Sequence, residues 1–251
     1  MQQKSLYGGV LLKAKEILDF ISKCETPPTL KEISNHVSIT KPTVLKILTT
    51  LEYCDFIRCV GNPKQYYLGL TFLTYAQKAK TSFNLDRIAM PFINNLRDKT
   101  TEAVNLGILE NNSIALLDRA QSTNTIRLDL QLGGHMSMYS SAMGKAILAC
   151  FPREKIEDYL DRTALIKLTE KTITNRDDIL NELVKTKKRG YSLDIGENQD
   201  GICCIGFTIK KNSDVLGAYS ISAPIYRVND SKLNLWIKEG LDTQRKIEAA
   251  V

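Results

Sequence analysis

The chain has 251 residues, of which 43% are hydrophobic and 25% charged, as expected of a globular protein with a buried core. It contains no apolar run of the roughly 18–20 residues that a membrane span requires, and its first residues lack the pattern of a signal peptide. We therefore expect a cytoplasmic protein that does not associate with membranes. In that compartment the six scattered cysteines should be free thiols.

The net charge of +6 is unevenly distributed along the chain. Residues 1–80 hold 11 Lys and Arg against 6 Asp and Glu, whereas residues 81–251 hold 23 against 22. Such an excess can hold an anionic polymer, and it can equally be a solvated basic surface. Charge alone leaves both readings open.

The first third of the chain reads as three helices and a hairpin. Apolar residues recur at helical spacing over 10–22, and a short helix follows from Thr29, which with Glu32 forms a capping-box pattern. A third helix begins after Thr40, and its predicted apolar face is the following set: Val44, Leu45, Ile47, Leu48 and Leu51. Strands over 56–60 and 65–69, joined by a turn, complete the order of a winged helix-turn-helix.

Helical sequence continues over 70–100 with a break near residues 81–84, which we take as a domain boundary. Beyond it, strands are predicted over 103–110, 113–120 and 125–132, then helices over 141–151, around 156–160 and over 176–190. Three further strands, over 191–196, 202–210 and 215–224, precede a last helix from about residue 232. Most turns are too short for crossovers, so the sheet should be mainly antiparallel.

Three blocks of sequence together resemble the IclR family of bacterial transcription regulators. They are TLKEISNHVSITKPTVLKILTTLEYCDFIRCVGNPKQYYLG, then HMSMYSSAMGKAILA, and then GYSLDIGENQDGICCIGF continued to YSISAP. The resemblance implies an α+β protein: a winged helix-turn-helix DNA-binding domain with a linker helix over residues 1–80, and a GAF-like α/β effector-binding and oligomerisation domain over residues 81–251. It further implies a repressor, with no enzyme activity and no cofactor, that binds a palindromic double-stranded DNA operator as a homodimer or homotetramer and responds to a small organic acid.

The resemblance also implies which residues contact DNA. A helix fits the major groove, and its first turns reach the base edges. The implied contacts lie on the third helix and the wing: Thr40, Lys41, Thr43, Lys46, Arg58 and Lys64. Two positions depart from the family pattern, because Pro42 stands where serine is usual and Lys46 where arginine is usual. Lysine offers a point charge rather than a two-pronged donor, so Lys46 is better suited to phosphate than to guanine.

By the same resemblance, a pocket for the effector is formed by residues from several elements: Leu128, Ser141, Ala142, Met143, Asp194, Cys204, Ser220 and Ser222. The helix that starts near Ser141 would direct its N-terminal N–H groups at an anionic ligand. The pair Gly144-Lys145 is not a P-loop, because Tyr139 and Ala146 stand where that motif needs glycine and Ser or Thr.

Other chemistry remains open for the cysteine-containing block. A metal held by Asp194, Glu197, Cys204 and His135 is conceivable, although the chain has only two histidines and no recognised zinc motif. A redox or metal sensor that uses Cys203 and Cys204 on the same DNA-binding platform is the main alternative, and a tethered enzyme is another. Neighbouring residues of a strand face opposite ways, which makes it hard for the two cysteines to share one metal ion. The expected site therefore contains no catalytic residues and no metal.

Overall fold

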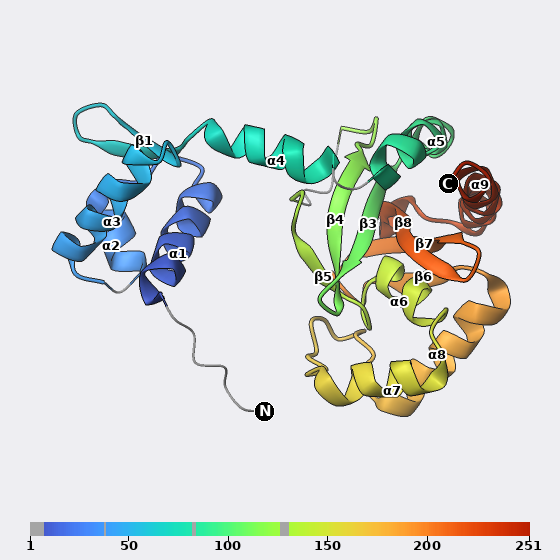
Figure 1. The fold of residues 1–251 in the computed structure, drawn as a ribbon. Coiled ribbons are helices and arrows are strands. Elements are labelled where there is room, and N and C mark those ends of the chain that lie inside the picture. Colours follow the sequence, from blue (N-terminus) through green and yellow to red (C-terminus); the bar gives the residue numbers. More distant parts are fainter. Residues whose placement is uncertain (1–7, 38, 82–83, 126–130) are drawn as a thin grey trace. The chain divides into compact units, whose positions relative to one another are not determined.

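The computed structural model describes residues 8–37, 39–81, 84–125 and 131–251. The chain folds into two compact units, Met1–Ser82 and Phe83–Val251 (Figure 1). Within the described residues, no helix is both long enough and apolar enough to cross a bilayer. The fold is the expected α+β arrangement, with a helix-turn-helix unit ahead of a larger unit built on an antiparallel sheet.

The first unit contains four helices and one hairpin: α1 (Gly9–Lys23), α2 (Leu30–His36), α3 (Lys41–Tyr53), β1 (Ile57–Val60), β2 (Gln65–Leu68) and α4 (Thr71–Thr81). The predicted capping box is present at α2, where the Thr29 backbone N–H donates to Glu32 at 2.7 Å. Apolar faces of α1, α2 and α3 meet in one core that includes Ile17, Ile33 and Leu48. The strands β1 and β2 pair antiparallel beside it.

One residue of the predicted apolar face of α3 is exposed in the structure. Val44, Ile47, Leu48 and Leu51 are buried, but Leu45 is 47% exposed. At 100° per residue, Leu45 lies about 60° beyond the edge of the core-facing stripe that the other four share. The prediction that Leu45 packs in the core is therefore wrong.

The second unit is built on six strands in the order β5-β4-β3-β8-β7-β6, and each neighbouring pair is antiparallel. The strands are β3 (Ala103–Glu110), β4 (Ser113–Ala120), β5 (His135–Ser137), β6 (Ser192–Ile195), β7 (Ile202–Lys211) and β8 (Asp214–Pro224). Most of the strand predicted over residues 125–132 falls outside the described residues, and the strand that pairs with β4 at the sheet edge is β5.

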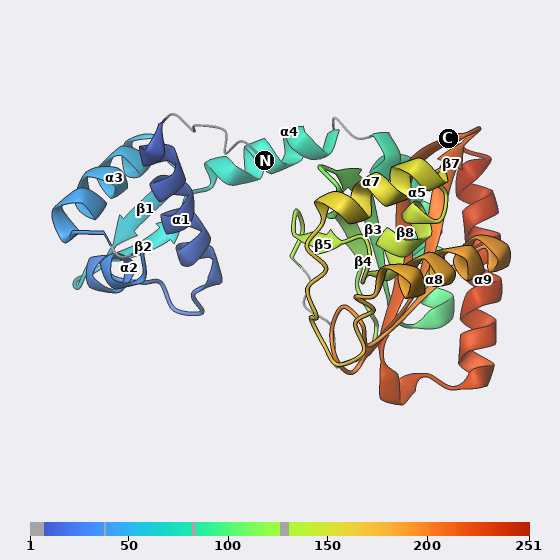
Figure 2. The same ribbon diagram turned by 90° about the horizontal axis from the view of Figure 1, so that it is seen from below.

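Helices cover both faces of this sheet (Figure 2). One face packs against α5 (Asn84–Thr100) and α9 (Asp230–Glu248), with Ile93 and Trp236 in their shared core. The other face carries α6 (Ala142–Leu148), which is flanked by α7 (Arg153–Arg162) and α8 (Arg176–Arg189). A short 3₁₀ helix (Ile225–Arg227) links β8 to α9.

The alternation of side chains along β7 and β8 separates the two faces. Tyr219 and Ile221 belong to the core under α5 and α9, so the side chains of Ser220 and Ser222 point to the face that carries α6. The helix α6 approaches this face closely at Gly206, where an added Cβ would lie 2.5 Å from backbone atoms of Ala142. Glycine at position 206 therefore sets how near the start of α6 lies to the sheet.

Candidate effector pocket and nucleic-acid interface

The surface of α3 and the hairpin presents the six residues predicted to contact DNA. Thr40, Lys41 and Lys46 are exposed, Thr43 is half-buried, and Arg58 and Lys64 are exposed on the hairpin. Thr40 is the N-cap residue by position, but its hydroxyl lies 3.0 Å from that of Thr43 and does not cap a backbone N–H.

Four cations of this surface are available to an external anion. Lys41, Lys46, Arg58 and Lys64 form no ion pair with any other residue in the part of the chain that the structure describes. The Arg58 guanidinium stacks 4.6 Å from the ring centre of Tyr67, its partner across the hairpin, which orients the group but does not neutralise it. Unpaired cations on a helix-turn-helix surface suit the phosphates of DNA.

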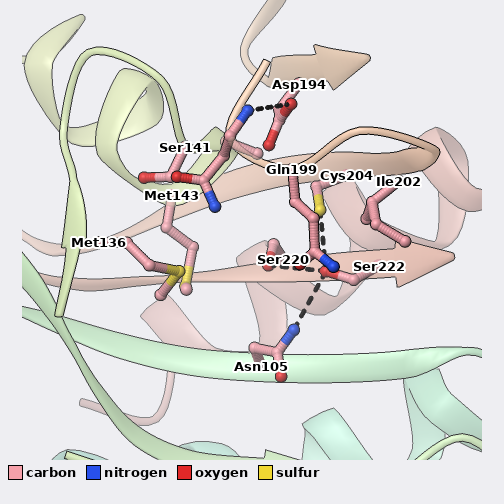
Figure 3. A pocket seen from close by; sticks show the side chains of 12 residues that line it. Asn105, Met136, Ser141, Met143, Asp194, Gln199, Ile202, Cys204, Ser220 and Ser222 are labelled. Atoms are coloured by element: carbon pink, nitrogen blue, oxygen red, sulfur yellow. Dashed lines mark hydrogen bonds between the residues drawn. The ribbon is translucent and has the colours of Figure 1, made fainter. Parts of the chain in front are cut away.

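A small cavity of about 30 Å³ lies in the second unit between the sheet and α6 (Figure 3). It is lined by Asn105, Met136, Ser141, Ala142, Met143, Asp194, Asn198, Gln199, Ile202, Cys204, Ser220 and Ser222. Seven of the eight predicted effector residues are thus brought to one place by α6, β6, β7 and β8. The eighth, Leu128, lies outside the described residues.

Hydroxyl, thiol and amide groups form a network on the sheet side of the cavity (Figure 3). The Asn105 amide and the Cys204 thiol each donate to Ser222 Oγ at 3.1 Å, and Ser220 Oγ lies 3.4 Å from Ser222 Oγ. Because Ser222 Oγ accepts both of those bonds, its proton is left to donate to Ser220 or to a ligand. Asn105 Oδ1 is buried and has no hydrogen-bond partner among the residues that the structure describes.

The start of α6 is less available than the sequence suggests. Ser141 Oγ donates to the Ser137 carbonyl at 2.7 Å and accepts from the Gly144 N–H at 3.2 Å. Its proton and one lone pair are therefore used by the fold, and only one lone pair remains for a ligand. The Ser141 side chain occupies the Gly144 N–H, so fewer N–H groups at the start of α6 are available to an anionic ligand than the sequence suggests.

Asp194 is similarly engaged. Its Oδ1 accepts from the backbone N–H groups of Glu197 at 2.7 Å and Asn198 at 3.2 Å, which fixes the turn after β6. This turn passes through Gly196, whose φ of 79° is readily adopted by glycine. The second oxygen of Asp194 accepts no hydrogen bond from another described residue, and Asp194 lines the cavity.

A buried ion pair stands behind the same turn, and sequence reasoning missed it. Lys145 Nζ donates to both carboxylate oxygens of Glu197, at 2.6 and 2.7 Å, and the Lys145 side chain is 1% exposed. The turn is further held by Thr172, whose hydroxyl donates to the Glu197 carbonyl at 2.6 Å. The signals were present as the Gly-Lys pair of α6 and the Gly-Glu pair after β6, but their spacing of 52 residues hides the contact.

Burial dominates the protonation behaviour of the site. It raises the pKa of Asp194, against the opposing effect of its two backbone hydrogen bonds and of Lys145. Burial also raises the pKa of Glu197, which the Lys145 ammonium partly counters. Desolvation raises the pKa of the Cys203 thiol to about 11 and raises that of Cys204 as well. Both thiols are therefore protonated at neutral pH and are poor nucleophiles.

The metal hypothesis finds no support in the geometry. His135 Nδ1 lies 2.8 Å from Ser113 Oγ, and its Nε2 lies 3.6 Å from Glu110, on the exposed edge of the sheet. Among the described residues, no three His, Cys, Asp or Glu side chains are grouped so as to hold a metal ion. Residues of the cavity that sequence reasoning missed are Asn105, Met136, Asn198, Gln199 and Ile202.

A larger cleft of about 190 Å³ lies near the ends of α6 and α8, beside β7 and α9. Lys187 and Lys210 line it, but so do Ala149 and Gly190, the C-cap residues of the two helices. The carbonyl oxygens at helix C-termini carry partial negative charge and oppose the attraction of the lysines for an anion. The smaller cavity between the sheet and α6 is the better candidate for a binding site.

Comparisons with known proteins agree with this architecture. The family model for the bacterial transcriptional regulator IclR C-terminal domain matches residues 77–249, and that for the IclR helix-turn-helix domain matches residues 10–60. The transcriptional repressor IclR of Escherichia coli is 28% identical over 226 residues, 89% of this chain and 82% of the relative. The E. coli regulator KdgR is 28% identical over 221 residues, 88% and 84% of the two chains.

Solved structures share the fold over almost the whole chain. IclR of Thermotoga maritima superposes with a TM-score of 0.83 at 29% identity, covering 96% of this chain and 98% of that one. An IclR homologue of Microbacterium hydrocarbonoxydans, solved with 4-hydroxybenzoate, has a TM-score of 0.77 at 18% identity, covering 96% and 99%. At that identity the second likeness concerns the fold alone.

Proposed function

Since the chain belongs to the IclR family of bacterial transcription regulators, we propose that it is a repressor that binds a palindromic operator and responds to a small organic acid. The family and the similar regulators of known role are DNA-binding regulators and not enzymes. In this proposal residues 1–80 bind DNA through α3 and the hairpin, and residues 81–251 bind the acid and assemble the oligomer.

The operator contact is supported by the unpaired cations of the first unit. Lys41, Lys46, Arg58 and Lys64 place positive charge around α3 and the hairpin, where phosphates flank a groove occupied by the helix. A palindromic operator needs two copies of α3 about one helical turn of DNA apart, so the active form is a homodimer or a homotetramer.

The effector site is carried by one observation, the buried hydroxyl cluster that faces the cavity. Ser220 and Ser222 offer hydroxyl donors, and the free oxygen of Asp194 offers an acceptor. Among the described residues that line the cavity, none is cationic. The acid group would therefore accept hydrogen bonds from the Ser220 and Ser222 hydroxyls, and a hydroxyl of the same ligand would donate to Asp194. A simple fatty acid lacks the second group.

The size of the cavity limits the acid further. A volume of about 30 Å³ admits about two water molecules, so even a two- to four-carbon acid requires side chains of the lining to move apart. The distant relation solved with 4-hydroxybenzoate indicates that this fold can accommodate a hydroxy acid in another protein. Here Met143, 2% exposed and beside Gly107, narrows the space. We therefore favour a short-chain hydroxy or keto acid over an aromatic one.

The response to the acid would be a shift between two arrangements of the oligomer. If the acid binds more tightly to one arrangement, it favours that arrangement by the difference in binding free energy. A change in the separation of the two α3 helices then weakens their fit to the operator. The alternative sensor built on Cys203 and Cys204 is disfavoured, because both thiols are protonated at neutral pH. Cys203 is also buried and pairs with Ala223 on the strand face that packs under α5 and α9, whereas Cys204 is half-buried at the cavity.

A thermal-shift screen of two- to four-carbon hydroxy and keto acids tests the effector proposal. An acid that binds only the folded state should raise Tm in proportion to the logarithm of its concentration. Ser222→Ala should weaken that acid by about 5- to 100-fold, the range for a lost buried hydrogen bond. Ser122→Ala, another buried serine outside the cavity, is the matched control.

Two outcomes would contradict the proposal. One is a Tm that no short acid raises. The other is a protein that releases DNA on thiol alkylation or on chelation of metals while the acids have no effect, which would favour the cysteine-based sensor.

A further inference from the structure

The exposed side of α3 carries an apolar side chain that is not packed in the core. Leu45 is 47% exposed, although it lies next to the buried Val44 and the exposed Lys46. Single exposed leucines are common and need no explanation by themselves. The position of Leu45 is what matters, because it shares a side of the helix with Lys41 one turn earlier and is followed by Lys46.

The polar groups beside Leu45 are better suited to phosphate than to bases. Lys41 and Lys46 are point charges that attract the backbone of DNA without distinguishing sequence. The hydroxyl of Thr43 lies 3.0 Å from that of Thr40, so one of their two protons is donated between them. Pro42 is exposed and has no side-chain donor or acceptor. The two lysines therefore add little sequence information, and part of the hydroxyl capacity near the start of α3 is already in use.

A major groove offers one apolar feature to such a surface. Among the four bases only thymine presents a methyl group there, at C5, and apolar side chains contact it. Leu45 and Pro42 form an apolar pair on the exposed side of α3, between the two lysines. We infer that Leu45, with Pro42 beside it, recognises the C5-methyl group of a thymine in each half of the operator. The inference rests on the proposed operator binding by α3.

Deoxyuridine provides a direct test, because it differs from thymidine only by the absence of that methyl group. A duplex is first selected from a random-sequence library with the wild-type protein, and its affinity is measured by fluorescence anisotropy. Each thymine is then replaced by deoxyuridine, one symmetry-related pair at a time. Replacement at one such pair of positions should lower the affinity, while replacement at the others should not. The expected loss is about threefold to tenfold for each methyl group removed, the amount expected for a buried methyl-sized apolar group.

The same duplexes are then measured with Leu45→Ala. This variant should bind the thymine duplex more weakly and should bind the thymine and deoxyuridine duplexes equally well at that pair of positions. Leu235→Ala is the matched control, because Leu235 is 46% exposed and lies on α9 of the other unit. It should retain the full effect of the methyl group. Thermal melting confirms that both variants are folded.

Three results would overturn the inference. Deoxyuridine could be tolerated at every position, or Leu45→Ala could keep the same dependence on the methyl group as wild type. A library from which the folded protein retains no duplex would contradict operator binding itself, and the inference about Leu45 with it.

Discussion

In the first unit Lys41 and Lys46 are exposed and carry no ion pair with another described residue, whereas in the second unit Lys145 is 1% exposed and is held by both oxygens of Glu197. The same type of side chain thus serves two purposes. An exposed lysine costs the fold little and remains available to a partner. A buried lysine depends on its partner, and here the pair fixes the wall of a cavity. Charge counted along a sequence does not separate these two cases, but burial does.

The largest expected effect comes from breaking the buried pair. Lys145→Ala leaves Glu197 buried without its cation, next to Asp194, and should lower the free energy of unfolding by about 3–5 kcal/mol. Lys167→Ala removes an exposed lysine paired with Glu170 and should cost less than about 1 kcal/mol. Urea unfolding of the two variants measures the contrast, and equal losses would show that burial does not distinguish the pairs.

A second change tests the close approach of α6 to the sheet. Gly206→Ala places a Cβ 2.5 Å from backbone atoms of Ala142, so α6 must move, at an expected cost of about 1–3 kcal/mol. The displaced helix should also abolish stabilisation by any acid that binds the cavity. Gly9→Ala, at an open position of α1, should be nearly neutral in both measurements. An acid response that survives Gly206→Ala would separate the effector site from α6.

The exposed lysines should affect DNA binding without affecting stability. Lys46→Ala should lower operator affinity several-fold and reduce the slope of log K against log salt by about one for each bound copy. Anisotropy titrations between roughly 50 and 200 mM salt measure that slope. Lys187→Ala, an exposed lysine of the second unit, should leave it unchanged. An unaltered slope in Lys46→Ala would remove Lys46 from the interface.

The smallest effect concerns pH. The folded pKa of Asp194 is raised by burial, so its contribution to stability is fully present below about pH 3.9 and is lost as the pH rises through the folded value. The titratable groups that interact with it are Lys145, Glu197, Cys203 and Cys204. Asp194→Asn keeps an oxygen for the turn and removes the charge. Unfolding midpoints measured from pH 4 to 7 should therefore fall less steeply in the variant, and identical slopes would contradict the assignment.

Much of this fold is readable from the sequence because its patterns are local. Period-two alternation in β7 and β8 places Cys204, Ser220 and Ser222 on one face, and helical spacing places Val44 and Leu48 in one core. The family resemblance then relates Asp194 to the same face. Residues that occupy the expected side of a regular element were predicted correctly in position, although their role in binding remains a prediction.

The rest depends on contacts between distant segments. The pair Lys145–Glu197 joins residues 52 apart, and Asn105 reaches Ser222 from β3 across 117 residues, so neither contact has a local pattern. The hydroxyl of Ser141 is used by its own helix cap, which a residue type cannot reveal. Leu45 is apolar, as the residues of the buried stripe are, but its position around the helix axis lies outside that stripe. Its side chain is therefore exposed.

The central claim is that an acid in the cavity of the second unit controls operator binding by the first. The most direct measurement is an anisotropy titration of the selected duplex with and without the stabilising acid, for wild type and for Ser222→Ala. The account predicts that saturating acid weakens wild-type binding at least several-fold, and that Ser222→Ala binds DNA normally but needs much more acid for the same effect. Equal responses of the two proteins to the acid would contradict it.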